Sequence, residues 1–106
     1  MGEMDNSPFF EEDSGLSTRE ETRQPKMYRV LLHNDHYTTM EFVIEILVNV
    51  FRKKADDANR IMMHVHTTGV GVCGVFTHDI AMTKVNEVHR RAREKGHPLR
   101  STVEEV

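Results

Sequence analysis

Hydrophobic and polar residues along the chain are arranged in patterns that predict three short strands between residues 26 and 106. Residues 27–33 (MYRVLLH) are apolar and β-prone, which favours a strand. Residues 70–76 (VGVCGVF) predict a second strand, which Gly71 and Gly74 weaken. Residues 99–106 predict a last one. Residues 34–37 (NDHY) predict a loop, because Asn and Asp side chains bond to their own backbone.

A helix is predicted to begin at Thr38, directly after this loop. Its apolar residues recur at helical spacing, at Met40, Val43, Ile44, Leu47 and Phe51. Thr38 and Glu41 have the spacing of a capping box, in which each side chain satisfies a backbone amide at the helix start. The cations of residues 52–54 (RKK) mark its predicted end, where they complement the helix dipole.

Two further helices are predicted. The second lies near residues 55–66, with the apolar stripe Ala58, Ile61, Met62 and Val65, and Gly69 suits its stop. The third is capped by Thr77 and stopped by Gly96. Its predicted core residues are Ile80, Ala81, Val85, Val88 and Ala92. The order β-α-α-β-α-β predicts an α+β fold, in which three helices pack on one face of a small three-stranded antiparallel sheet.

The first 25 residues lack any sustained period and differ in charge from the rest. Residues 1–24 hold seven acidic residues against two arginines, a charge of −5. The whole chain of 106 residues carries −3, so the remainder carries +2. We therefore expect residues 1–25 to be a disordered acidic extension, and residues 26–106 to form one folded domain.

Composition excludes several classes of function. With a net charge of −3 and a pI near 6.1, the chain has no basic stripe for nucleic acid. It has no apolar run of about 18 residues that would span a membrane. The acidic N-terminus lacks the features of a secretory signal or transit peptide. A single cysteine, Cys73, forms no internal disulfide, and we expect a cytoplasmic protein.

Metal and catalytic chemistry are both disfavoured. The seven histidines are scattered, without an HExxH motif or a Cys/His cluster, so neither metal nor cofactor is expected. Cys73 lies within an apolar strand, as a packed small residue would. Asp35 and His66 lack an accompanying nucleophile turn. We expect no enzyme.

A binding pocket is the better interpretation of the polar and methionine residues. Met40 begins a helix beside the polar pair Asn34 and Asp35. Met62 shares an apolar stripe with the residue that precedes His66. An apolar hollow rimmed by a carboxylate, an amide and an imidazole is typical of a ligand site.

The same residues carry a resemblance to a known family. Residues 28–43 (YRVLLHNDHYTTMEFV) resemble the ClpS signature, in which an Asn-Asp-Asp turn precedes Tyr-Thr-Pro-Met-Glu-Phe-Val. Residues 73–77 (CGVFT), 83–85 (TKV) and 96–99 (GHPL) resemble it too, so the similarity covers about residues 26–106. His36 replaces the second Asp of the turn, which removes a negative charge close to the expected ligand amine. Thr39 replaces its Pro, which would preset the backbone for entry into the helix.

The resemblance implies a non-enzymatic adaptor. Such a protein binds substrates that begin with Leu, Phe, Tyr or Trp, and it docks on the N-terminal domain of a ClpA-type AAA+ unfoldase. The resemblance assigns the substrate's α-amino group to Asn34, Asp35 and His66. It assigns the side-chain pocket to Thr38, Met40, Val43, Met62, Val65 and Leu99. Contact with the unfoldase is assigned to Asp79 and Lys84.

One alternative remains open from the sequence. A small α/β partner-docking domain without a degron pocket, as in ribosomal stalk proteins, would have a similar size and shape. Such a domain needs no site that combines an amine acceptor with a hydrophobic pocket. The clustering of Asn34, Asp35, Met40 and His66 therefore favours the adaptor.

Overall fold

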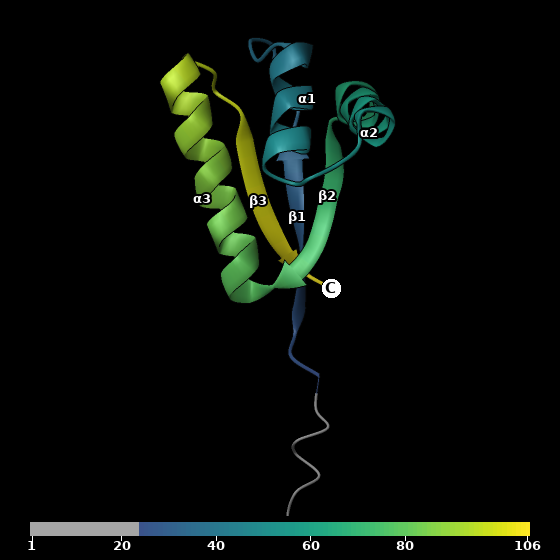
Figure 1. Ribbon diagram of the computed structural model, residues 1–106, viewed down its shortest axis with the longest axis vertical. Coiled ribbons are helices and arrows are strands. Elements are labelled where there is room, and N and C mark those ends of the chain that lie inside the picture. Colours follow the sequence, from purple (N-terminus) through teal and green to yellow (C-terminus); the bar gives the residue numbers. More distant parts are fainter. Residues whose placement is uncertain (1–23) are drawn as a thin grey trace, which may run out of the picture.

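The computed structural model describes residues 24–106 and contains three strands and three helices in the predicted order (Figure 1). The elements are β1 (Met27–His33), α1 (Met40–Asn49), α2 (Ala55–Thr68), β2 (Val70–Thr77), α3 (His78–Lys95) and β3 (Arg100–Glu105). The predicted acidic extension, residues 1–25, lies outside the described residues except for its last two positions. No helix in the described part of the chain is long and apolar enough to cross a membrane.

The three strands form one antiparallel sheet, as the sequence predicts, and their order across the sheet is β2-β1-β3. β1 lies in the middle, with Met27 opposite Thr77 of β2 and Tyr28 opposite Glu105 of β3. The far end of β1 pairs in the same way, because His33 is opposite both Val70 and Arg100. The loop that follows β1 therefore begins beside the start of β2.

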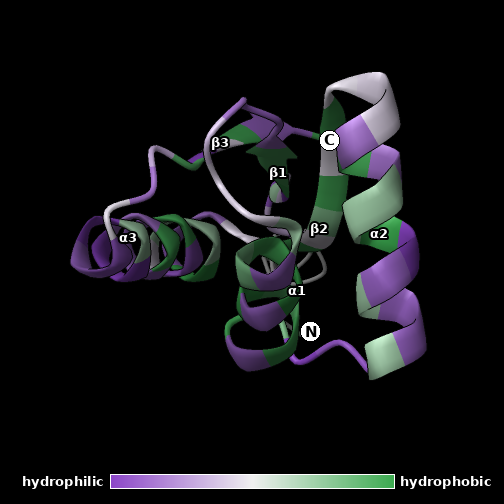
Figure 2. Ribbon diagram, turned by 90° about the horizontal axis from the view of Figure 1, so that it is seen from above, coloured by the Kyte–Doolittle hydropathy of each residue, from purple (hydrophilic) through white to green (hydrophobic). Residues whose placement is uncertain are grey.

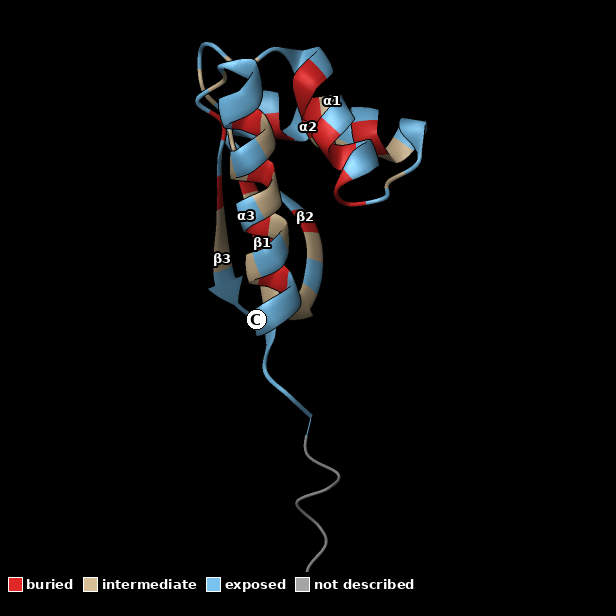
Figure 3. Ribbon diagram, turned by 60° about the vertical axis from the view of Figure 1, so that its left-hand side comes forward, coloured by how far each residue is buried: buried red, intermediate tan, exposed pale blue. Residues whose placement is uncertain are grey.

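The helices lie on one face of this sheet, and α1 lies between α3 and α2 when the molecule is seen from above (Figure 2). α3 packs along all three strands, whereas α2 packs on α1 and β2. Buried positions recur along each helix (Figure 3), and those of the three helices join β1 in one core. Its fully buried centre contains Val30, Leu32, Ile46, Leu47, Val65, Cys73 and Val88.

Glycines end two helices where the sequence predicts it. Gly69 follows α2 with φ 97°, and Gly96 follows α3 with φ 74°. Both angles are in the left-handed region, where glycine has no side chain to clash. Each glycine N–H bonds to a carbonyl of the helix that it ends.

The start of α1 differs from the predicted capping box. Thr39, not Thr38, is the N-cap, and its hydroxyl accepts a hydrogen bond from the Phe42 N–H at 3.1 Å. The Thr38 hydroxyl instead donates to Asp35 at 2.8 Å. The Thr38 hydroxyl is occupied by its bond to Asp35, three residues earlier, so the adjacent Thr39 caps the helix.

Two smaller expectations were also wrong, and a third is confirmed in position only. α1 ends at Asn49 without a cation in its last turn, so Arg52 lies beyond the helix. Thr77 is the N-cap of α3, as predicted, although its side chain makes no capping hydrogen bond. Ile80 is 50% exposed, because one helical step of about 100° separates it from the buried Ala81.

Candidate functional site

The loop between β1 and α1 is organised by the carboxylate of Asp35. Its Oδ1 accepts the backbone N–H of Tyr37 at 2.8 Å and that of Thr38 at 2.6 Å. Its Oδ2 accepts the hydroxyl of Thr38 at 2.8 Å. These three bonds fold the chain back on itself within four residues, which is the geometry of an Asx-type turn. Asp35 therefore shapes the loop and also presents a charge there.

Hydrogen bonds keep this carboxylate ionised. Partial burial acts to raise the pKa of Asp35, but the hydrogen bonds from Thr38 and Tyr37, together with the nearby His97, outweigh burial and lower the pKa below its usual value. Asp35 is half-buried, so its charge lies close to apolar surface. A carboxylate with spare lone pairs in this position suits a cationic ligand group.

The loop is held against the far end of α2. The backbone N–H of Asn34 donates to the carbonyl of Gly69 at 2.9 Å, which joins the end of β1 to the turn between α2 and β2. His66 lies three residues before Gly69, exposed in the last turn of α2. The structure thus brings Asn34 and Asp35 beside the helix end that carries His66.

The hydrophobic residues assigned to the pocket belong to the core. Val43, Met62, Val65 and Leu99 are each 7% exposed or less, and they belong to one cluster. Met40 is 41% exposed at the first position of α1. Four of the assigned residues are therefore packed in the core, whereas Met40 keeps part of its surface exposed.

Sequence reasoning missed His97 as a member of this neighbourhood. Its ring lies 4.5 Å from that of Phe42, measured between centroids, and its charge is one of the causes that lower the pKa of Asp35. The signal was present in residues 96–99, where only Leu99 was assigned to the site. The spacing could not show that the turn after α3 approaches the loop after β1.

The residues assigned to the partner lie on α3, apart from this loop. Asp79 is exposed in the first turn, where its carboxylate lies 3.8 Å from His78. Lys84 is half-buried, and its Nζ donates to the carbonyl of Val50 at 2.8 Å. That ammonium also lies 5.7 Å from the centre of the Phe76 ring. Lys84 thus connects α3 to the end of α1.

Chemistry other than binding has little support among residues 24–106. No group of three or more His, Cys, Asp or Glu side chains there is placed to hold a metal ion. Burial raises the pKa of the Cys73 thiol to about 12, so this thiol is not a ready nucleophile. What the loop offers is a fixed carboxylate, an amide and an imidazole beside apolar residues.

Sequence comparison gives consistent matches along the chain. The family model described as ATP-dependent Clp protease adaptor protein ClpS matches residues 23–102. A protein of Nitratidesulfovibrio vulgaris (strain Miyazaki F), named ATP-dependent Clp protease adapter protein ClpS, is 60% identical over 89% of this chain and 94% of its own. A protein of the same name from Syntrophus aciditrophicus is 49% identical over 100% of this chain and 99% of its own.

A solved structure is similar as well. ClpS2 of Agrobacterium tumefaciens, determined bound to L-phenylalaninamide, is 43% identical to this chain. The two structures superpose with a TM-score of 0.76 over 78% of this chain and 100% of the other. The relative therefore shares the whole arrangement of helices and strands described above.

Proposed function

Because the chain belongs to the ClpS family of ATP-dependent Clp protease adaptors, we propose that it binds the free N-terminus of substrate proteins that begin with Leu, Phe, Tyr or Trp. It then delivers them to a ClpA-type AAA+ unfoldase. One observation carries the proposal, namely the ionised Asp35 held in a hydrogen-bonded loop beside buried apolar residues. The L-phenylalaninamide bound to the Agrobacterium relative supports it, since this ligand has a free α-amino group and a large apolar side chain.

The amino group is the first half of the recognised feature. Asp35 supplies a negative charge, Asn34 a side-chain carbonyl and His66 a ring nitrogen as acceptors. Each hydrogen bond to a charged group contributes roughly 1.5–3 kcal/mol. The three bonds that Asp35 already accepts fix its position before the ligand arrives, which lowers the cost of ordering the site.

The side chain is the second half. We assign its pocket to Thr38, Met40, Val43, Met62, Val65 and Leu99. Because several of these residues are packed in the core, entry of a Leu or Phe side chain requires them to move. The two methionines have flexible unbranched side chains and are suited to that displacement. Burial of the substrate side chain then contributes roughly 1.5–3 kcal/mol.

Specificity follows from the need for both halves. Three bonds of about 2 kcal/mol each and one buried side chain of about 2 kcal/mol together reach about −8 kcal/mol, the level of micromolar binding, whereas neither contribution does so alone. An internal Leu lacks the amine, and an N-terminal Gly lacks the side chain. The proposed role is that of a cytoplasmic adaptor that binds its substrate, without catalytic residues or cofactor.

Delivery is assigned to Asp79 and Lys84 on α3. α3 begins at the end of the molecule opposite the loop that contains Asp35 (Figure 1). That separation leaves the loop free to hold a substrate while α3 contacts the N-terminal domain of the unfoldase. A docking surface on α3 thus fits the adaptor role.

The alternative is a partner-docking domain without a degron pocket. The tight burial of Val43, Met62, Val65 and Leu99 favours it, because these residues present little free surface to a ligand. The two functions differ in their response to a short peptide. Only the adaptor binds the N-terminus of a peptide.

A fluorescence anisotropy titration separates them. Four labelled peptides with identical later residues begin with Leu, Phe, Gly or N-acetyl-Leu. The adaptor binds the Leu and Phe peptides and discriminates against the other two, because each of these lacks one half of the recognised feature. Equal affinity for all four peptides, or none for any, would leave only the docking domain.

A further inference from the structure

The tip of the loop between β1 and α1 carries a histidine that the proposed binding of the α-amino group does not use. His36 is exposed. Among residues 24–106, the histidine rings that make hydrogen bonds or ion pairs are those of His33, His78 and His89. The His36 ring therefore keeps its full hydrogen-bonding capacity for a ligand.

The backbone that carries His36 is nevertheless fixed. Asp35 precedes it, and the Asp35 Oδ1 accepts the N–H groups of Tyr37 at 2.8 Å and Thr38 at 2.6 Å, on the far side of His36 along the chain. These two bonds close the chain around His36. Since consecutive Cα atoms are about 3.8 Å apart, the imidazole is anchored directly beside the Asp35 carboxylate.

Under the proposed function, Asp35 holds the substrate's α-ammonium, and this position limits where the second substrate residue lies. The Cα of that residue is about 3.8 Å from the Cα of the first. On the protein side, His36 has the same spacing from Asp35. The second substrate residue and His36 are therefore both next to the ion pair, and an acidic side chain on the substrate is within reach of the imidazole.

The chemistry at residue 36 decides which second residues the site admits. Asp35 is the one acidic residue among residues 34–40, and the bound α-ammonium balances its charge. An imidazole has an N–H donor in both its neutral and its protonated form, so it donates to a carboxylate in either state. A second aspartate at this point, as in the ClpS signature, would instead repel a carboxylate.

We propose that His36 forms a subsite for the second residue of the substrate and admits Asp or Glu there without loss of affinity. The substrate class is then a large apolar N-terminal residue followed by an acidic one. This subsite rests on the proposed function, because the acidic side chain is placed relative to an α-ammonium on Asp35. His97 adds positive potential nearby, since it is one of the causes that lower the pKa of Asp35.

Two labelled peptides test the subsite by fluorescence anisotropy on the full-length protein. They begin with Leu-Glu or Leu-Gln and are otherwise identical, so they differ by one charge at the second residue. We expect the Glu peptide to bind the unmodified protein at least as tightly as the Gln peptide. Weaker binding of the Glu peptide would overturn the proposal.

His36→Asp should remove this tolerance. The ratio of the two dissociation constants should shift by about two- to fivefold against the Glu peptide, which is the size of an interaction between exposed charges. The ratio is the decisive measurement, because the added carboxylate also attracts the α-ammonium that both peptides share. Glu41, exposed in the first turn of α1, is present in every variant and cancels in the comparison. An unchanged ratio would contradict the subsite.

His36→Asn separates charge from the shape of the loop. The Asn amide keeps an N–H donor and adds no charge, so the ratio should stay close to that of the unmodified protein. A shift as large as that of His36→Asp would mean that any change at the tip disturbs the loop. The proposed recognition of the acidic side chain would then be wrong.

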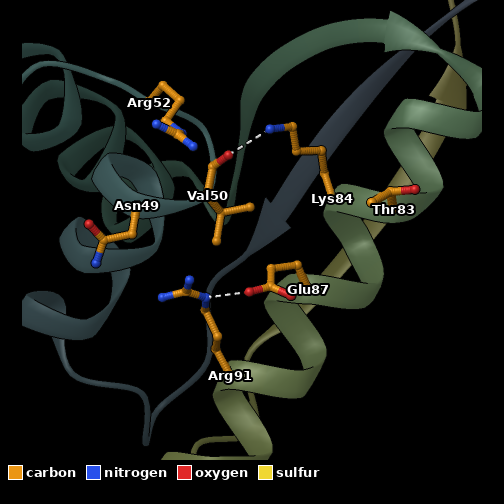
Figure 4. Close-up of a pocket in the computed structure, with 7 residues that line it drawn as sticks. All are labelled: Asn49, Val50, Arg52, Thr83, Lys84, Glu87 and Arg91. Atoms are coloured by element: carbon orange, nitrogen blue, oxygen red, sulfur yellow. Dashed lines mark hydrogen bonds and ion pairs between the residues drawn. The ribbon is translucent and has the colours of Figure 1, made fainter.

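Asn49→Asp is the matched control for the added charge. Asn49 is exposed at the last position of α1, and it lines a pocket of about 260 Å³ between α1 and α3 together with Arg52 and Arg91 (Figure 4). The helical rise from Met40 to Asn49 is about 14 Å, and the screening length is about 10 Å at 0.1 M salt. This variant should therefore leave the ratio unchanged. A shift equal to that of His36→Asp would show an effect of net charge alone and remove the case for a subsite.

Failure of the subsite differs from failure of the proposed function. If neither Leu-start peptide binds, the proposed function is wrong and the subsite with it. If both peptides bind and their ratio does not respond to His36→Asp, the proposed degron site stands and only the subsite is wrong.

Discussion

The two ends of α1 are held in different ways. At the N-terminal end, Asp35, Thr38 and Thr39 make every side-chain bond within three residues along the chain. At the C-terminal end, the Val50 carbonyl accepts a hydrogen bond from Lys84, which is 34 residues away. The first end is fixed locally, whereas the second depends on where α3 packs.

This difference matches the proposed roles of the two ends. A loop that is ordered mainly by its own side chains, with one backbone bond from Asn34 to Gly69, depends little on where α3 packs, which suits a site that must present a carboxylate to a ligand. A helix end that depends on a remote lysine is affected by contacts that a partner makes on α3. The comparison predicts that changes at one end leave the function of the other intact.

Removal of the Asp35 side chain should give the largest effect. Asp35→Ala removes the charge that is proposed to face the substrate amine and all three bonds that organise the loop. A charge-assisted bond contributes roughly 1.5–3 kcal/mol, so affinity for a Leu-start peptide should fall roughly 10- to 150-fold. Fluorescence anisotropy measures the affinity, and circular dichroism checks that the domain stays folded.

Asp35→Asn is the matched control for this change. Its amide oxygen still accepts backbone N–H groups, so the loop keeps most of its order while the negative charge is lost. If the asparagine variant binds as tightly as the original, charge is not the basis of recognition. If the alanine variant also binds normally, the site lies elsewhere.

Lys84→Met should give a smaller effect at the other end of α1. It keeps an apolar stem over Phe76 and leaves the Val50 carbonyl without its donor. The free energy of unfolding should fall by about 1–3 kcal/mol, as urea denaturation measures. Lys95→Met, an exposed change at the end of the same helix, is the control and should have little effect.

Peptide affinity decides whether the two ends are independent. The Lys84→Met variant should bind a Leu-start peptide as the original does, because its defect is confined to the C-terminal end of α1. A large loss of peptide affinity would mean that the loop around Asp35 depends on α3. The two ends of α1 would then not be independent of each other.

The local end was predictable from sequence apart from one residue. Asn34 to Met40 carry turn and cap residues in order, so the sequence predicted both the loop and the helix start. Which threonine caps the helix, Thr38 or Thr39, depends on where the Asp35 carboxylate points. Residue spacing alone does not determine that direction.

The remote end was not predictable in the same way. Arg52 was expected to complement the dipole of α1, yet the helix ends earlier and Arg52 takes a left-handed backbone. Lys84 was assigned to a partner, and its bond to Val50 joins two segments that no sequence pattern connects. The approach of His97 to Asp35 was missed for the same reason.

The smallest expected effect is on the pH dependence of folding stability, which again compares a remote contact with the loop around Asp35. His89 makes a remote contact, in which its Nε2 accepts the Ser101 N–H at 3.0 Å. Burial and the nearby Arg93 and Arg100 lower the pKa of His89 below 6.5. The unfolded chain therefore binds more protons than the folded one, and stability should decline as pH falls below about 6.5.

Asp35 gives the local counterpart in a lower pH window. Because its bonds lower the pKa of the folded carboxyl below 3.8, its contribution to folding stability is complete above that value and is lost as pH falls further.

Urea denaturation between pH 7.5 and 3 should show the two declines in stability separately. His89→Gln should flatten the upper decline, although His33, whose pKa burial and Arg100 also lower, keeps part of it. Asp35→Asn should flatten only the lower decline. A flattened upper decline in the Asp35→Asn variant would show that the loop is coupled to the remote contacts, against the separation argued from the two ends of α1.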